Sequence, residues 1–364
     1  MPDEIFCGSE LDQFSALGEI WAGLPEGGAG APAERARRHA KGEARGAAAV
    51  KNSATNAPPV IRAADYLTGE VFSVERTTAG WWATKPVPDD IGRYYPKIYY
   101  GERRRRFPGP VEWLQSWLYG RRAGWVTRVA GRAGTVLDVG CGPGHLLARF
   151  RALGWATVGT EATPAATAIP REKYGLDVRA GELGGLKFSG ASFDAVVSWH
   201  TLEHMRDPLD VLDEFTRLLK PGGLLFVSVP DFSSPEAIVK PSAWFHLDVP
   251  RHLAHFPADI LRSQLRARGF SIAAEGFFAP EYDTFSLTQT WQNRLGLPHN
   301  LLYLMLKSST GAGTTQPTFA ERIAAGLLAV VTIPFAAIVT LWRTWRQRGA
   351  VIVILARKAG SVQG

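Results

Sequence analysis

Residues Val136–Leu146 read VLDVGCGPGHL, and this stretch decides the fold of the chain. An apolar run is interrupted by Asp138, and three glycines then follow at alternate positions, Gly140, Gly142 and Gly144. The apolar and β-branched residues Val136, Leu137 and Val139 are typical of a buried parallel strand. Glycine lets the backbone turn tightly and approach a ligand closely. The stretch therefore predicts a strand, a ligand-binding turn and the start of a helix.

The spacing of the glycines separates this turn from a dinucleotide-binding one. A dinucleotide fold needs G-x-G-x-x-G, whereas this chain has G-x-G-x-G followed by His145. The next predicted strand, Ala156–Thr160, ends at Glu161, which is 23 positions after Asp138. A carboxylate at that place is suited to accept hydrogen bonds from ribose hydroxyls. A tight turn that binds nothing remains the alternative.

Later segments continue the alternation of strands and helices. They are a third strand at Leu176–Ala180, an acidic turn at Gly181–Leu183, a fourth strand at Phe193–His200, a helix start at Asp207–Pro208, a turn at Lys220–Gly223 and a fifth strand at Leu224–Val229. With these segments the chain resembles class I S-adenosylmethionine-dependent methyltransferases, over roughly residues 90–280 plus the C-terminal strand. Within this family, the chain resembles in its motifs the small-molecule enzymes that carry an H-x-L-E-H segment, which is His200–His204 here. The resemblance implies a Rossmann-like, doubly wound α/β fold whose seven-stranded sheet is mostly parallel with an antiparallel last strand.

The same resemblance implies S-adenosylmethionine as the cofactor. The cofactor-binding residues that it implies are Asp138, Gly140, Cys141, Gly142, Gly144, Glu161, Glu182, Leu183 and Trp199. Among them, Glu161 is expected to bind the ribose, and Glu182 with Leu183 to border the adenine. Asp138 is expected to hold the methionine part together with the first two glycines, although an acid at a strand end can also simply cap the turn.

A histidine-rich segment, Trp244–Phe256, follows the fifth strand and precedes a predicted helix at Pro257–Arg268. It is expected to cover the C-terminal edge of the sheet, where doubly wound proteins bind their ligands. Three histidines, an acid and an arginine within ten residues are unusual for a connector. The segment is therefore predicted to face the substrate.

Within this segment, His252 is predicted to accept the proton of the methyl acceptor near neutral pH, with Asp248 orienting it. His246 and Arg251 are predicted to bind the substrate, Arg251 by pairing with an anionic group. The alternative is that Asp248 pairs with Arg251 and that the histidines only cap and pack the loop. His200, which directly follows the fourth strand, is a competing catalytic residue.

The second informative segment is 323–342, twenty residues without a charge. Its basic flanks are Arg322, Arg343, Arg346 and Arg348. This length can span a hydrocarbon layer of about 30 Å, and the arginines suit anionic head groups. Residues 350–358, however, read as the last strand of the sheet, which a single crossing would place on the wrong side of the membrane. Pro334 therefore favours a re-entrant or interfacial helical hairpin, with a helix buried in the protein or in a dimer as the alternative.

Composition and charge restrict the partners and the compartment. The chain carries a net charge of +7 but no recognised nucleic-acid-reading module, so no nucleic-acid partner is predicted. The arginines at 103–106 are expected either to contact phosphates or lipid head groups or to form a solvated face. Cys7 and Cys141 are too few for a disulfide framework and predict a reducing compartment and no metal site. With an acidic N-terminus at Asp3 and Glu4 there is no sign of a signal peptide, so a cytoplasmic protein at the inner face of the cell membrane is predicted.

Five regions are expected along the chain. They are a disordered tail at 1–60, a small element at 61–109, the methyltransferase domain at 110–280, an insertion with the apolar hairpin at 281–348, and the last strand with a tail at 349–364. The tail is rich in Gly, Ala, Pro, Arg and Lys and cannot bury enough apolar surface to fold. Some relatives carry a zinc ribbon before the catalytic domain, but residues 77–80 of this chain are Thr, Thr, Ala and Gly where its cysteines would stand. The small element is therefore predicted to be a metal-free remnant or a lid.

The predicted activity is methyl transfer to an oxygen or carbon of a small molecule. A sugar, glycolipid, polyprenyl-linked or quinone-like acceptor is favoured, because the apolar insertion would bring the site to a membrane. Two alternatives stay open: a soluble natural-product methyltransferase, in which the apolar segment is a lid or dimer helix, and a non-catalytic scaffold with a vestigial cofactor pocket.

Overall fold

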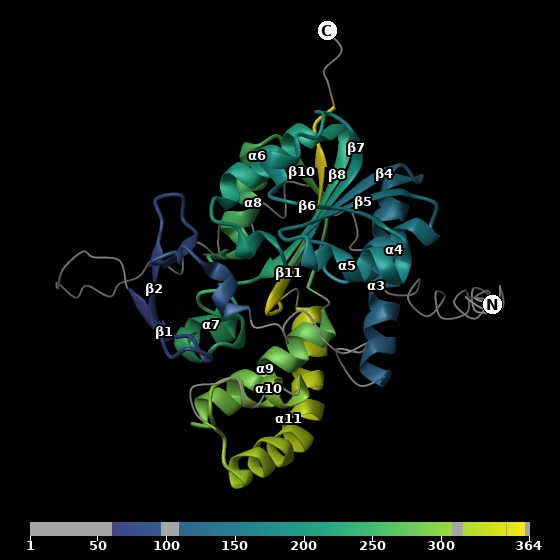
Figure 1. The fold of residues 1–364 in the computed structure, drawn as a ribbon. Coiled ribbons are helices and arrows are strands. Elements are labelled where there is room, and N and C mark those ends of the chain that lie inside the picture. The colour runs from purple at the N-terminus through teal and green to yellow at the C-terminus, as the bar shows by residue number, and fades with distance from the viewer. Residues whose placement is uncertain (1–59, 96–108, 278, 308–315, 347, 361–364) are drawn as a thin grey trace, which may run out of the picture. The chain divides into compact units, whose positions relative to one another are not determined.

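Seven strands form the main sheet of the computed structural model, in the order β10-β11-β8-β7-β4-β5-β6 (Figure 1). They are β4 (Thr135–Val139), β5 (Ala156–Glu161), β6 (Asp177–Ala180), β7 (Phe193–Trp199), β8 (Leu219–Pro230), β10 (Phe270–Gly276) and β11 (Val351–Lys358). The strands from β4 to β8 pair in parallel, and β11 is antiparallel to both of its neighbours, β8 and β10. The predicted doubly wound sheet with an antiparallel last strand is confirmed.

The structure describes residues 60–95, 109–277, 279–307, 316–346 and 348–360. These residues belong to one compact unit, Pro58–Gly364. The expectations for the tail at 1–60, for Cys7 and for the arginines at 103–106 lie outside the described residues, apart from Val60.

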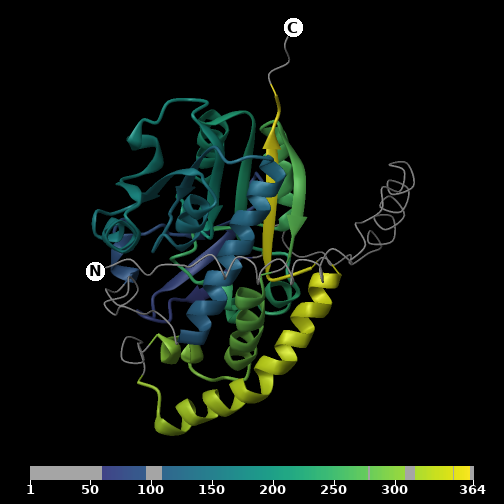
Figure 2. The same ribbon diagram turned by 90° about the vertical axis from the view of Figure 1, so that its right-hand side faces the viewer.

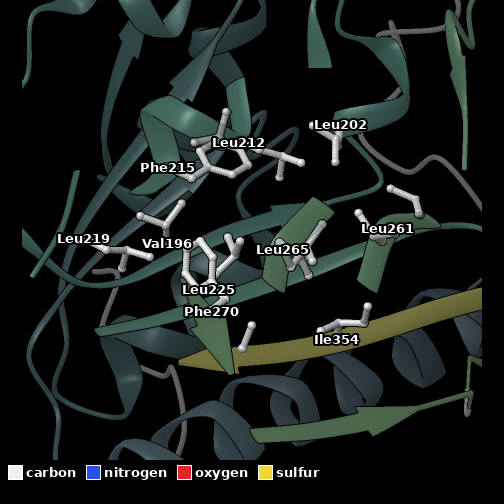
Figure 3. Packing of buried hydrophobic residues seen from close by; sticks show 14 of the residues in the cluster. Val196, Leu202, Leu212, Phe215, Leu219, Leu225, Leu261, Leu265, Phe270 and Ile354 are labelled. Atoms are coloured by element: carbon white, nitrogen blue, oxygen red, sulfur yellow. The ribbon is translucent and has the colours of Figure 1, made fainter. Parts of the chain in front are cut away.

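Side chains alternate between the two faces of the sheet, and each face packs against its own helices. In β11, Ile352, Ile354 and Ala356 belong to one core cluster and Val351, Val353 and Leu355 to the other. The first cluster includes side chains of α6 (Pro208–Leu218) and α8 (Ala258–Ala267), which Figure 3 shows packed against the sheet. The second includes side chains of α3 (Gly109–Ala130) and α4 (His145–Ala152). Each fully buried Leu or Phe in these layers contributes roughly 1.5–3 kcal/mol to folding.

A smaller sheet has the order β1-β2-β3-β9. Its strands are β1 (Ile61–Ala64), β2 (Val71–Arg76), β3 (Trp82–Lys85) and β9 (Ala254–His255). Because β9 comes from the histidine-rich segment, the N-terminal strands do not stand alone but share one layer with that segment. Residues 77–80, where the zinc-ribbon cysteines would be expected, connect β2 to β3.

Residues 231–256 are called the roof segment below. They contain α7 (Pro235–Val239), η6 (Pro241–Ala243), η7 (Phe245–Leu247) and β9. The Leu253 N–H donates to the Glu203 carbonyl at 2.7 Å, so the roof segment lies against η5 (Leu202–His204), the short helix that follows β7. The remaining short helices are η1 (Ile91–Tyr94), η3 (Ala165–Thr167), α5 (Ala168–Tyr174) and η4 (Leu183–Leu186).

A helical insertion separates β10 from β11. It consists of α9 (Pro280–Arg294), α10 (Leu301–Leu306) and α11 (Phe319–Trp345). The predicted helical hairpin is wrong, because α11 is a single helix of 27 residues with Pro334 inside it. Proline removes one backbone hydrogen bond and bends a helix without necessarily ending it, and Figure 2 shows α11 bending along its length.

Candidate active site

The turn after β4 has the backbone that its glycines predict. Gly140, Gly142 and Gly144 have φ of 68°, 54° and 81°, a region that side-chain-bearing residues rarely adopt. A Cβ added at Gly142 would meet nothing within 4 Å, so open space lies beside this residue. A Cβ at Gly144 would lie 2.8 Å from atoms of Pro170 and Leu176, so this glycine serves packing within the protein.

Glu161, at the end of β5, reaches the glycine turn. Its carboxylate accepts a hydrogen bond from the Gly142 N–H, while the N–H groups of Gly140 and Cys141 donate to the Thr160 carbonyl. Burial raises the pKa of the Glu161 carboxyl, and the hydrogen bonds from Gly142 and Ala162 lower it. The turn and the acid therefore form one cradle with a backbone open to a ligand, which fits the predicted cofactor.

The other predicted cofactor residues flank this cradle. Asp138 is 2% exposed, and burial together with the nearby Glu161 raises its pKa well above the usual range. The Gly181 N–H donates to the Glu161 carbonyl at 2.9 Å, which places the start of η4, with Glu182 and Leu183, next to the end of β5. Burial raises the pKa of the Cys141 thiol, whose side chain belongs to the core below the turn.

Trp199 ends β7 inside a polar and aromatic cluster. The guanidinium carbon of Arg122 lies 4.1 Å from the centre of a Trp199 ring, and the indole N–H donates to the Tyr282 hydroxyl at 3.3 Å. Arg122 pairs with Glu281, and both side chains are less than a tenth exposed. Within the described residues, Arg122 Nη1 and Glu281 Oε2 lack a hydrogen-bond partner. Sequence reasoning missed Arg122, because an arginine in a helix usually indicates a solvated face.

His200 directly follows β7 and is held in an unusual way. Its φ is 51°, and its ring stacks on Tyr282 at 4.2 Å between centroids. The His200 Nδ1 lies 3.2 Å from Glu203 Oε1, while its Nε2 is buried without a partner among the described residues. Burial alone would raise the pKa of the Glu203 carboxyl. The hydrogen bond from His200 and the charges of His200, His204 and His252 outweigh burial and lower this pKa to about 2. Because an ionised carboxylate only accepts, Nδ1 donates, and in the neutral ring Nε2 carries the lone pair.

Arg251 lies inside the protein instead of facing a substrate. It is fully buried, donates to Asp65 at 2.7 Å and to Asp248 at 2.8 Å, and lies 4.4 Å from the centre of the Tyr66 ring. Its third main contact is the Tyr94 carbonyl at 3.1 Å. The structure thus favours the alternative in which Asp248 pairs with Arg251. The hydrogen bond between His252 and Asp248 joins their backbones, from the His252 N–H to the Asp248 carbonyl at 3.0 Å.

The histidines of the roof segment have separate surroundings. His252 Nδ1 lies 2.7 Å from the His246 carbonyl, so this nitrogen is occupied. His246 Nε2 is buried without a partner in the described structure, and its ring lies 6.4 Å from that of His200. Burial, followed by the nearby His200 and His252, lowers the pKa of His246 well below its usual range, so this ring is neutral at pH 7. His200 and His246 therefore present two unpaired ring nitrogens in one region.

The comparisons with known proteins agree with this arrangement. Residues 114–275 match the family model of a methyltransferase domain. The chain contains a class I S-adenosylmethionine-dependent methyltransferase domain. S-adenosylmethionine is accordingly the expected cofactor of this methyltransferase domain.

Three similar proteins illustrate the match. A ubiquinone biosynthesis O-methyltransferase of Dinoroseobacter shibae is 30% identical over 44% of this chain and 62% of its own length. A protein of Mycolicibacterium smegmatis described as a probable S-adenosylmethionine-dependent methyltransferase is 35% identical over 29% of this chain and 40% of its own. The crystal structure of an S-adenosylmethionine-dependent methyltransferase from Archaeoglobus fulgidus has a TM-score of 0.43 at 17% identity, over 67% of this chain and 94% of that one. The chain spans about 40–62% of the length of the two curated relatives.

Proposed function

We propose that this chain transfers the methyl group of S-adenosylmethionine to an oxygen or carbon of a small-molecule acceptor. The observation that carries the proposal is the pairing of β4 with β7, because it sets the cradle of Gly142 and Glu161 beside the pair of His200 and Glu203. The bound cofactor supplies an electrophilic methyl group. The residues of the chain hold donor and acceptor in line and remove a proton from the acceptor.

Each side of the cradle has a proposed role in binding the cofactor. Glu161 accepts from the ribose hydroxyls, and the turn at Gly140–Gly144 with Asp138 borders the methionine part. Glu182 and Leu183 border the adenine. Arg122 adds a role that the sequence did not predict: its unpaired Nη1, close to Trp199, is suited to bind the carboxylate of the cofactor.

The proposed general base is His200 rather than His252. Its Nδ1–H is held by the Glu203 carboxylate, so Nε2 is a lone-pair acceptor in a fixed orientation. His252 instead holds the His246 carbonyl through Nδ1, and its predicted partner Asp248 is bound to Arg251. His246, with its free Nε2, is retained as a residue that binds the acceptor. Arg251 has no proposed substrate role, because its donors are occupied inside the protein.

Cofactor binding tests the proposal first. Isothermal calorimetry of detergent-solubilised full-length protein is expected to show saturable binding of S-adenosylmethionine and S-adenosylhomocysteine. The Gly142→Arg variant fills the open space beside the turn and is expected to abolish binding. The Val71→Glu variant, at an exposed position on β2, is the matched control and is expected to bind as the natural chain does. A folded natural chain that binds neither compound would leave the non-catalytic scaffold as the better account.

The membrane contact is proposed for one face of α11. Its buried side chains are Ala325, Ala329, Ala336 and Thr340. Large apolar side chains are exposed along the helix: Phe319, Ile323, Leu327, Val330, Val331, Ile333, Phe335, Ile338, Leu341, Trp342 and Trp345. At 100° per residue the buried four fall on one side of the helix and most of the exposed set on the opposite side. A continuous apolar face of this size is unusual on a soluble monomer.

A lipid surface fits this face better than the other occupants considered. The helix is long and apolar enough to cross a membrane by length and composition. Arg346 packs over the rings of Trp342 and Trp345, which is the mixture of aromatic and basic groups typical of the lipid head-group region. β11 begins only six residues after α11 ends and joins the main sheet, so a single crossing of the membrane by α11 would separate β11 from that sheet. A helix lying along the membrane surface avoids this separation. A buried core helix is disfavoured, since only four of its residues are buried.

Vesicle binding tests the membrane contact. We expect the protein to sediment with anionic phosphatidylglycerol vesicles and less with neutral phosphatidylcholine vesicles. Replacing Leu327 and Ile338, each 64% exposed, by Glu is expected to lower the affinity more than about tenfold, because each buried side chain contributes roughly 1.5 kcal/mol or more. Glu at Val71 and Leu153, exposed positions outside the helix, is the matched control. Loss of binding in both pairs, or in neither, would contradict the assignment to α11.

The acceptor class follows from these two sites. An active site beside a lipid-bound helix favours an acceptor that resides in or near the membrane, such as a quinone-like or polyprenyl-linked molecule, and a cytoplasmic location at the inner face of the membrane. The relatives named as ubiquinone O-methyltransferases support small-molecule O-methylation. A soluble natural-product methyltransferase, with α11 as a lid or dimer helix, is the second candidate, and it predicts no vesicle binding.

A further inference from the structure

Three potential metal ligands converge between η5 and the roof segment. Glu203, His204 and His252 each offer one ligand atom, and these atoms all lie within 4.8 Å of one another. Glu203 and His252 are 1% and 8% exposed. Two imidazoles and one carboxylate are a donor set that proteins use for zinc and for other divalent first-row metals.

The two histidines are already oriented as metal ligands are. His204 Nδ1 lies 2.8 Å from the Arg251 carbonyl, and His252 Nδ1 lies 2.7 Å from the His246 carbonyl. Because a carbonyl can only accept, each Nδ1 carries a proton and each Nε2 keeps its lone pair. Almost all histidine ligands donate their far ring N–H to a carboxylate, a backbone carbonyl or a water in this way.

One of the two carboxylate oxygens of Glu203 has no hydrogen-bond partner among the described residues. Oε1 faces His200, whereas Oε2 is buried and has no hydrogen-bond partner in the part of the chain that the structure describes. Leaving a buried acceptor unsatisfied costs stability, and more so for a charged group. A cation at this place would supply the missing partner while leaving the bond to His200 intact.

We propose that Glu203, His204 and His252 bind one divalent cation of the zinc class, which joins η5 to the roof segment. Three protein ligands leave a fourth tetrahedral position, which water would fill. Binding of the cation does not depend on methyl transfer. The proposal departs from the sequence expectation of no metal, which rested on the cysteines; the three ligands come from two segments separated by 47 residues.

Metal titration of full-length protein in detergent tests the site. After dialysis against a chelator, we expect the natural chain to bind about one Zn²⁺, to raise its Tm on binding, and to bind Co²⁺ with the visible absorption of a tetrahedral site. His204→Gln and His252→Gln are expected to abolish the Co²⁺ spectrum. His255→Gln is the control, because His255 is a buried roof histidine held by Thr84 at 2.9 Å and lies outside the ligand set.

The outcomes separate clearly. A folded natural chain that binds neither ion, or ligand variants that bind Co²⁺ as the natural chain does, would overturn the proposal. If a ligand variant fails to fold by circular dichroism, the zinc-dependent rise in the Tm of the natural chain decides. Because these readouts do not involve S-adenosylmethionine, they stand whether or not methyl transfer is found.

Discussion

Replacing Arg251 by Met is expected to destabilise the protein rather than to weaken substrate binding. The guanidinium is fully buried and pairs with Asp65, whose side chain is 0% exposed, and with Asp248, whose side chain is 13% exposed. Methionine has a similar length but no charge, so both carboxylates would stay behind without their cation. Breaking a buried ion pair by removing one partner costs about 3–5 kcal/mol. For a domain of this size, that corresponds to a fall in Tm on the order of 10 °C.

The assay is urea unfolding followed by tryptophan fluorescence, near neutral pH and with the detergent held constant. A triple variant, in which Asp65 and Asp248 become Asn as well, is the matched control and is expected to recover part of the loss, because it leaves no unpaired buried charge. An Arg251→Met protein with an unchanged urea midpoint but a raised KM for the acceptor would refute the reasoning and restore Arg251 as a substrate ligand.

Three further predictions follow from single positions. His200→Gln is expected to lower kcat by about 10²–10⁴ with the Kd for S-adenosylmethionine unchanged, and an unaltered kcat would remove His200 as the base. Burial, then the charge of His252, lowers the pKa of His255 to about 3, so the folded state stays neutral while the unfolded state binds a proton below about pH 6.5. Stability therefore falls as the pH drops from 6.5 towards 3, by about 2 kcal/mol at pH 5 from this residue. Unfolding measured at pH 6.5 and at pH 5 should show a smaller fall in stability for His255→Gln than for the natural chain. Gly144→Ala is expected to unfold at lower urea than Gly142→Ala, because both lie at positive φ but only Gly144 would drive its Cβ to 2.8 Å from Leu176; equal midpoints would contradict the packing role.

The main sheet could be predicted because its signals are local. The glycine turn and the apolar strands around it are each set by neighbouring residues, whereas the mostly parallel sheet with its antiparallel last strand was implied by the family resemblance. Residues 350–358 were predicted as the last strand because this apolar run resembles the last strand of the methyltransferase sheet.

The candidate site was predicted less well, because its contacts are distant in sequence. Arg251 meets Asp65 across 186 positions, and no spacing rule indicates such a pair. The sequence supplied both His200 and His252 as candidates for the base, but only the direction of each ring nitrogen distinguishes them. The shape of α11 was missed because a proline can either end a helix or only bend it, and the sequence does not distinguish these two effects.

The place of β11 in the sheet has a consequence for how the protein is made. This strand lies between β8 and β10, although α9, α10 and α11 all precede it in the chain. During synthesis, the apolar helix therefore leaves the ribosome while the sheet still has a gap, and β10 has no neighbouring strand in the main sheet until β11 is made. The nascent chain thus exposes its most apolar helix before the main sheet can close. The membrane contact proposed for α11 would therefore form first, and completion of the domain would follow.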